Sequence, residues 1–136
     1  MMFGSLQVTS AEYGTTDRRW LRDVHGLDDT LGVTLDGSLF PAARFPDGVV
    51  PSGVVLGQVT ATRLWGPYDN AATDGRQTAR GHLAAHRIVA AGVRVQAAVM
   101  DHGAVIRNYL PANAGLDAAA EAELVRVRYS TTPDGA

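Results

Sequence analysis

The sequence contains no cysteine and no lysine among its 136 residues. Without cysteine, the chain has no disulfide, no thiolate metal site and no cysteine nucleophile. Without lysine, it has no P-loop lysine for phosphate binding and no Schiff-base chemistry. All 12 basic residues are therefore arginine, and 14 acidic residues outnumber them. This balance argues against the basic surface of a nucleic-acid-binding protein, so we expect no nucleic-acid partner.

Long apolar runs are also absent from the sequence. No stretch approaches the length of a transmembrane helix, and the N-terminus lacks a basic segment followed by an apolar one. We therefore expect neither export nor a membrane partner. The length corresponds to one domain, and 46% apolar with 19% charged residues is typical of a globular fold.

Motifs for catalysis and metal binding are missing as well. No serine lies in a Gly-x-Ser-x-Gly elbow, no Gly-x-Gly-x-x-Gly follows a strand, and no two carboxylates stand out as a glycosidase pair. His82 and His86 have the spacing found in zinc proteases, but Leu83 stands where those enzymes carry glutamate. The segment is typical of a strand, so we expect partly exposed histidines and no metal. No catalytic residue, cofactor or enzyme activity is expected.

What the sequence does contain is a series of short strand-like runs between turns rich in Gly, Pro, Asn and Asp. The central run, 54–64, alternates apolar and polar residues between turns at 46–53 and 66–75. Further strands are expected at 32–40, within 88–100, at 104–110 and at 124–129, with a hairpin-type turn at 101–103.

The C-terminal part predicts one short helix and one regular strand. In 117–123, acidic residues occupy the first turns, where they favour the positive end of the helix dipole. In 124–129, the residues Val125, Val127 and Tyr129 alternate with Leu124, Arg126 and Arg128. This period of two predicts that these three side chains share a buried face.

The opposite face of the last strand carries Arg126 and Arg128. These arginines could form a basic stripe, but Glu121 and Glu123 nearby would blunt it, which favours a solvated strand face. Tyr68 follows a Gly-Pro turn. We expect it to pack back across that turn rather than to bind a ligand.

Together these runs predict a mainly β fold, a compact β-clip or barrel-like domain with one short C-terminal helix and an extended N-terminal arm. The expected boundaries are an arm at 1–31, a β-rich domain at 32–130 and a polar tail at 131–136. The arm has no sustained period, and a single helical turn with Asp17 as N-cap is expected within 17–23. Because Trp and Arg anchor interfaces, a partner-binding arm is favoured over a free terminus.

Four motifs occur in a suggestive order: PSGVVLG at 51–57, GPY at 66–68, TDG at 73–75 and ARGHL at 79–83. In this order they resemble the bacteriophage head decoration proteins of the lambda protein D type. The resemblance continues through Pro111 to the closing strand. The chain departs from that pattern in its longer arm and in two extra residues after Gly75.

The resemblance implies a structural virion protein that decorates and stabilises the expanded phage capsid. It implies a homotrimer at three-fold and quasi-three-fold positions of the major capsid protein lattice, on the outer capsid surface, after synthesis in the host cytoplasm. The expected capsid-binding residues are Tyr13, Trp20, Leu21 and Arg22 in the arm, with Val33 and Leu35 able to add a strand to an exposed sheet edge. The alternative that stays open is a small monomeric β-barrel module that binds a ligand or peptide in a concave pocket.

Overall fold

The computed structural model describes residues 17–134 as a chain of short elements. The strands are β1 (Leu31–Asp36), β2 (Val49–Val50), β3 (Val55–Gln58), β4 (Trp65–Pro67), β5 (Gly81–Leu83), β6 (Arg87–Ile88), β7 (Arg94–Met100), β8 (Gly103–Ile106) and β9 (Val127–Ser130). The α-helix is α2 (Ala118–Glu123), and single 3-10 turns are η1 (His25–Asp28), η2 (Gly37–Leu39), η3 (Pro46–Gly48) and η4 (Arg107–Tyr109).

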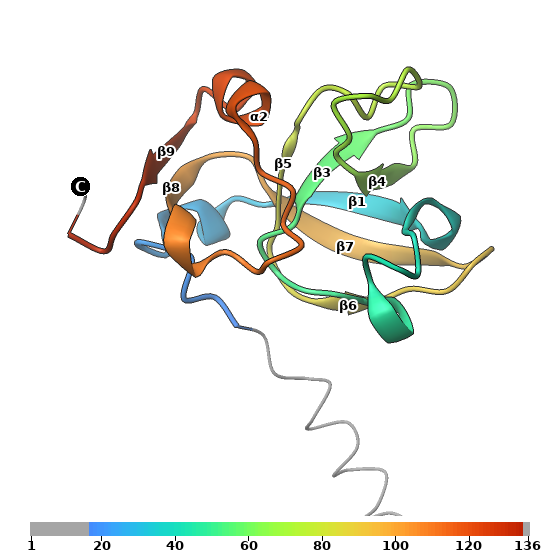
Figure 1. Ribbon diagram of the computed structural model, residues 1–136, viewed down its shortest axis with the longest axis horizontal. Coiled ribbons are helices and arrows are strands. Elements are labelled where there is room, and N and C mark those ends of the chain that lie inside the picture. The colour runs from blue at the N-terminus through green and yellow to red at the C-terminus, as the bar shows by residue number, and fades with distance from the viewer. Residues whose placement is uncertain (1–16, 135–136) are drawn as a thin grey trace, which may run out of the picture.

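The centre of the fold is a closed barrel with the strand order β1-β4-β3-β5-β7. Two small sheets, β2-β6 and β8-β9, lie beside it, and α2 leads into β9 at the periphery (Figure 1). The prediction of a mainly β, barrel-like domain with one short helix near the C-terminus is confirmed.

Strand β1 shows how the alternating sequence builds the barrel interior. It pairs antiparallel with β7 over its whole length, and it meets β4 at the single pair Leu35–Trp65. Val33 and Leu35 both face inward, because side chains alternate across a strand. The barrel core consists of Val33, Leu35, Phe40, Phe45, Val50, Val54, Leu56, Trp65, Leu83, Val89, Ala97 and Val99.

The central run is a hairpin and not the single strand predicted over 54–64. Strand β3 ends at Gln58, and β4 pairs back onto it with Gln58 opposite Trp65. The reversal is closed by a hydrogen bond of 2.8 Å from Val59 N to Leu64 O. It depends on Arg63, which has a φ of 64°. A positive φ is uncommon outside glycine, so the sequence pattern carries no sign of this turn.

Glycines in two of the motifs let the loop at 69–78 pack against β3. At Gly75, which has a φ of 119°, a Cβ atom would lie 2.3 Å from the carbonyl oxygen of Gln58. At Gly57, a Cβ atom would lie 2.8 Å from the Cα atom of Arg76. Only glycine permits both backbone approaches, which is the physical reason for glycine in these motifs.

The predicted hairpin at 101–103 is wrong. Strand β7 belongs to the barrel, whereas β8 pairs in parallel with β9 in a separate sheet. The chain therefore leaves the barrel at Asp101 instead of folding back on β7. The turn residues at 101–103 predict that the chain changes direction, but they do not predict which strand β8 pairs with, because that depends on residues far along the chain.

The C-terminal predictions are confirmed for the helix and only in part for the strand. The Asp117 side chain accepts a hydrogen bond of 2.8 Å from Ala120 N, which caps α2. The hydroxyl of Tyr68, which is buried as expected, lies 3.0 Å from the same carboxylate. Val125 is 82% exposed, however, because β9 begins only at Val127. The prediction that Val125 lies on the buried face is therefore wrong.

Candidate functional site

The segment that follows residue 16 is part of the folded domain. Trp20 is 1% exposed, and its carbonyl oxygen accepts a hydrogen bond of 2.7 Å from Ile106 N. Leu21 forms an antiparallel bridge with Val105 of β8. A hydrogen bond of 3.0 Å from Leu21 N to Arg18 O closes the turn expected here, but the chain then continues along β8 and not as a helix.

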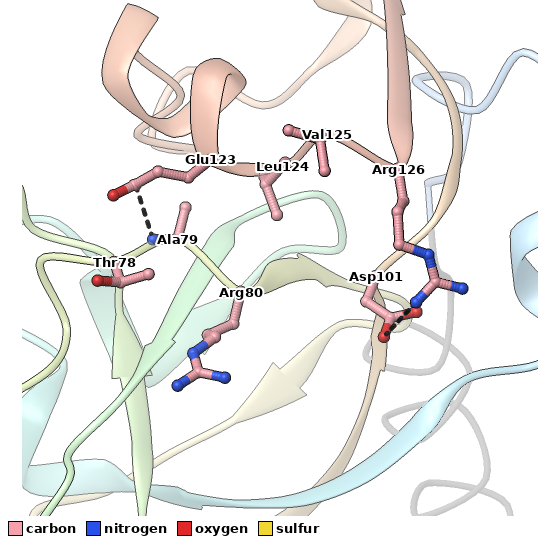
Figure 2. Close-up of a pocket in the computed structure, with 8 residues that line it drawn as sticks. All are labelled: Thr78, Ala79, Arg80, Asp101, Glu123, Leu124, Val125 and Arg126. Atoms are coloured by element: carbon pink, nitrogen blue, oxygen red, sulfur yellow. Dashed lines mark hydrogen bonds and ion pairs between the residues drawn. The ribbon is translucent and has the colours of Figure 1, made fainter.

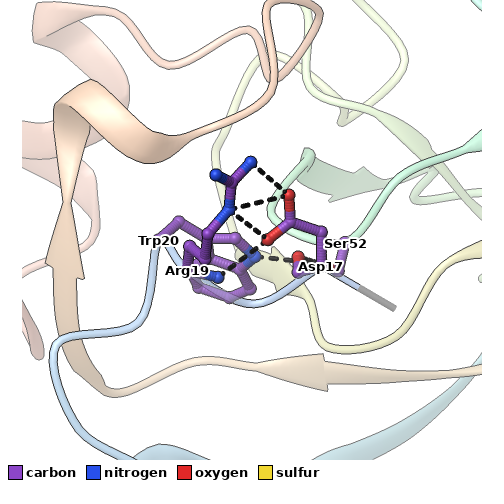
Figure 3. Close-up of polar contacts among 4 residues, drawn as sticks. All are labelled: Asp17, Arg19, Trp20 and Ser52. Carbon is purple, nitrogen blue, oxygen red and sulfur yellow. Dashed lines mark hydrogen bonds and ion pairs between the residues drawn. The ribbon is translucent and has the colours of Figure 1, made fainter. Parts of the chain in front are cut away.

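A chain of polar contacts fixes the Trp20 side chain in place (Figure 3). The indole Nε1 donates to Ser52 Oγ at 3.0 Å. The Ser52 hydroxyl in turn donates to the carbonyl oxygen of Asp17. The exposed Asp17 carboxylate pairs with Arg19 at 2.8 Å. Ser52 thus uses both of its hydrogen-bonding functions to tie the N-terminal segment to the turn before β3.

His82 lies beneath Trp20 and is fully buried. The two rings stack with 5.5 Å between centroids and 27° between planes. Nδ1 of His82 lies 2.7 Å from Gly53 O, and Nε2 lies 2.7 Å from the Tyr129 hydroxyl. A carbonyl oxygen only accepts, so Nδ1 carries the proton and Nε2 accepts from Tyr129. The prediction of a partly exposed histidine is wrong at this position.

The burial of this cluster controls its charge. Desolvation lowers the pKa of His82 to about 4, so the imidazole is neutral near pH 7. Burial raises the pKa of the Tyr129 hydroxyl, which keeps it protonated as a donor. Because Trp20, His82 and Tyr129 come from three distant segments, the cluster joins the N-terminal segment, the barrel and β9. We call these three residues the aromatic latch.

The structure separates the residues predicted to bind a capsid. Trp20, Val33 and Leu35 are buried, Leu21 is half-buried and Arg22 is exposed, while Tyr13 lies outside the described residues. Strand β1, which carries Val33 and Leu35, already pairs with β7 over its full length. Capsid contact by these six residues stays a prediction.

Within residues 17–134, no group of three or more His, Asp or Glu side chains is placed to hold a metal ion. In the same range, no helix has the length and apolar character needed to cross a bilayer. Open hollows lie on this part of the surface. One of them, of about 400 Å³, has Phe40, Phe45 and Val89 on its lining.

The arginine face of β9 is solvated, as expected, because Arg126 and Arg128 are both exposed. The Glu121 carboxylate accepts hydrogen bonds of 2.8 and 2.7 Å from Arg107, and Glu123 accepts one of 3.0 Å from the loop before β5. Glu123 also lines the same hollow as Arg126. The weakening of the basic stripe by these two acids stays a prediction.

A family model for the bacteriophage lambda head decoration protein D matches residues 35–127, which is more than half of the chain. The chain belongs to this family. A search of curated proteins found no match. The decoration protein is a structural component of the phage head, and its family binds the capsid. The match begins in β1 and ends in β9, so it spans the barrel and α2 and leaves Trp20 outside.

Proposed function

We propose that the protein stabilises the expanded phage capsid as a homotrimer at three-fold and quasi-three-fold positions of the major capsid protein lattice. It acts on the outer capsid surface after synthesis in the host cytoplasm. The family match over residues 35–127 is the observation that carries the proposal. A protein that binds only the expanded lattice stabilises that lattice by mass action, and this role needs no catalysis.

The proposed capsid-binding arm is 1–31, followed by the decoration domain at 32–130 and a tail at 131–136. A binding arm restrains a domain only if the point where the arm joins the domain is fixed. The burial of Trp20 and its hydrogen bond with Ile106 support such an attachment beside β8. Three arms in one trimer would raise the avidity without a tight single contact.

The individual residues have different parts in this proposal. Tyr13, Leu21 and Arg22 are proposed as direct capsid contacts, because Arg22 is exposed and Leu21 is half-buried beside it. Trp20 contributes by fixing the point where the arm joins the domain. Val33 and Leu35 are buried and contribute by holding β1 in the barrel, where β1 pairs with β7 on one side and meets β4 on the other.

The monomeric β-barrel module that binds a ligand has less support. The twelve side chains of the barrel core occupy the interior of the closed barrel, as is usual for small barrels. A ligand would therefore have to bind on the outside, in one of the open hollows. Such hollows do not offer the enclosed apolar site that small-molecule binding normally requires.

Expanded capsid shells mixed with the protein should show three-fold symmetric density at the three-fold and quasi-three-fold positions in electron cryomicroscopy. The density should lie outside the shell, and each site should hold three copies. Undecorated shells of the same preparation are the control. Single copies at each site, or density on the inner surface, would contradict the proposal.

A chain that begins at Asp17 should keep its fold but bind expanded shells at least about tenfold more weakly, which corresponds to about 1.4 kcal/mol. Truncation at this point retains Trp20, whereas a deletion of 1–31 would also remove a buried side chain. Co-sedimentation with shells measures the binding, and thermal unfolding confirms the fold. The full-length Arg94→Ala variant is the matched control for an exposed change. Equal binding by the truncated and full chains would refute a role for residues 1–16 in capsid binding.

A further inference from the structure

The outer edge of β9 has no strand beside it among the described elements. On its inner side, β9 pairs in parallel with β8, with Gly103 opposite Val127 and Ile106 opposite Ser130. Figure 1 shows β9 at the periphery, with β8 between it and the rest of the molecule. The edge of β8 that faces away from β9 is already paired, because Leu21 forms a bridge with Val105 there.

The backbone of β9 presents its free groups to this edge. The carbonyl oxygen of Arg126 accepts a hydrogen bond of 3.2 Å from Gly103 N, so the backbone of this residue points toward β8. Since backbone groups alternate in direction along a strand, those of Arg128 also point toward β8. The N–H and C=O of Tyr129 point outward, where a further strand would find them.

Three arginines lie on this sheet, Arg126 and Arg128 on the strand at the outer edge and Arg22 beyond β8, and they have few anionic partners. Arg126 is 67% exposed, and its Nη1 lies 3.9 Å from Asp101 Oδ2, which is a loose contact. Arg128 is exposed and stands opposite the small residue Ala104 in the sheet register. Arg22 lies on the other side of Ala104, to whose carbonyl oxygen its N–H donates at 3.0 Å. Neither Arg22 nor Arg128 forms an ion pair within residues 17–134.

A hollow of about 260 Å³ adjoins the start of β9 (Figure 2). Val125, at 82% exposure the most exposed large apolar side chain described, lies on its lining. Figure 2 shows Asp101 beside Arg126, and Glu123 bonded to the backbone of Ala79 elsewhere on the lining. The hollow at the start of β9 therefore combines the exposed side chain of Val125 with two arginines, Arg80 and Arg126, and two acids, Asp101 and Glu123.

We propose that the outer edge of β9 binds an extended, acidic segment of another protein, which adds as a strand to the β8-β9 sheet. Main-chain hydrogen bonds to Tyr129 would supply affinity, and acidic side chains at alternate positions would face Arg126 and Arg128. A small apolar side chain of the partner would cover Val125. This proposal concerns β9 and does not depend on the capsid-binding arm.

The charges on the edge decide between this partner and a second copy of the chain. Pairing of β9 with β9 of another copy would place arginine opposite arginine, and like charges directly opposite each other destabilise a sheet. Charged side chains on a short edge strand are a common device against such self-pairing. An acidic strand turns the same charges into favourable cross-strand pairs.

The probe is an eight-residue peptide that alternates glutamate with valine or threonine, titrated into the full-length protein. Amide NMR shifts should concentrate at residues 125–130, and hydrogen exchange at the Tyr129 amide should slow. The same peptide with lysine in place of glutamate should not bind. Shifts spread over other surfaces, or equal binding by the lysine peptide, would overturn the proposal, as would tighter binding of a single-stranded DNA oligonucleotide at the same residues.

The double variant Arg126→Glu and Arg128→Glu should bind the glutamate peptide at least about tenfold more weakly and should gain binding to the lysine peptide. Arg94→Glu, at the first residue of β7, is the matched control, because it makes the same change at an exposed strand arginine. Unfolding midpoints of both variants confirm that they are folded. Unchanged binding by the double variant, or an equal loss with Arg94→Glu, would exclude β9 as the site.

Discussion

Replacing Trp20 with alanine is expected to lower the free energy of unfolding by about 3–5 kcal/mol, the usual loss for a large buried aromatic side chain. Three contributions would disappear together: the buried indole, the hydrogen bond of 3.0 Å to Ser52 and the stacking on His82. Small domains are stable by only about 5–15 kcal/mol, so this is a large fraction of the total. Urea unfolding measures the change.

Arg22→Ala is the matched control for this experiment, because Arg22 is two residues away and exposed. Its effect on stability should stay within about 0.5 kcal/mol. If Trp20 acted only as a capsid anchor, alanine at position 20 would weaken capsid binding and leave unfolding unchanged. That result would contradict the structural role of the aromatic latch.

The stability of the protein is expected to fall by about 3 kcal/mol as the pH drops from 6.5 to 4, because of His82. Burial lowers the pKa of the folded imidazole to about 4 from an ordinary value of 6.5. Between these two values the unfolded chain binds a proton that the folded chain does not. The stabilisation that comes from neutral His82 is therefore fully present above pH 6.5 and is lost as the pH falls from 6.5 to 4. Urea unfolding at half-unit pH steps measures the slope.

His82→Gln should be less stable at pH 7 but should show a flatter pH dependence between 6.5 and 4, since the titrating group is gone. Arg94→Ala, a change at an exposed strand residue, should keep the slope. Hydrogen bonds from the Arg19 side chain and the Arg76 backbone lower the pKa of Asp17 and Asp74. The stabilisation that these two carboxylates contribute is lost only at still lower pH. An identical slope in His82→Gln would rule out His82 as the source.

The aromatic latch also bears on the proposed function. The arm at 1–31 is proposed to bind the capsid, and any pull on the part of it before Asp17 reaches the domain through Trp20 and its neighbours. The backbone bond of 2.7 Å from Ile106 N and the contact with Ser52 connect this point to β8 and to the turn before β3. A capsid-bound arm would thus be held by two separate parts of the fold.

Local patterns predicted those elements whose cause lies within a few residues. The helix at Ala118–Glu123 was predictable because Asp117 caps it from one residue away. The inward face of β1 was predictable because the positions of Val33 and Leu35 repeat with a period of two. The hairpin in 54–64 was not, because it depends on the positive φ of Arg63, for which the residue type gives no signal.

By itself, the sequence determined that this is a mainly β chain with one short helix and without thiol or lysine chemistry, and its motif order indicated the decoration protein family. Turn residues and strand periodicity act locally, so composition and spacing suffice for them. Only the tertiary structure decided that Trp20 is a core residue, since its hydrogen-bond partner Ser52 lies 32 positions away. His82 and Tyr129 meet across 47 positions for the same reason. Burial and pairing depend on which segments fold together, and no local pattern encodes that choice.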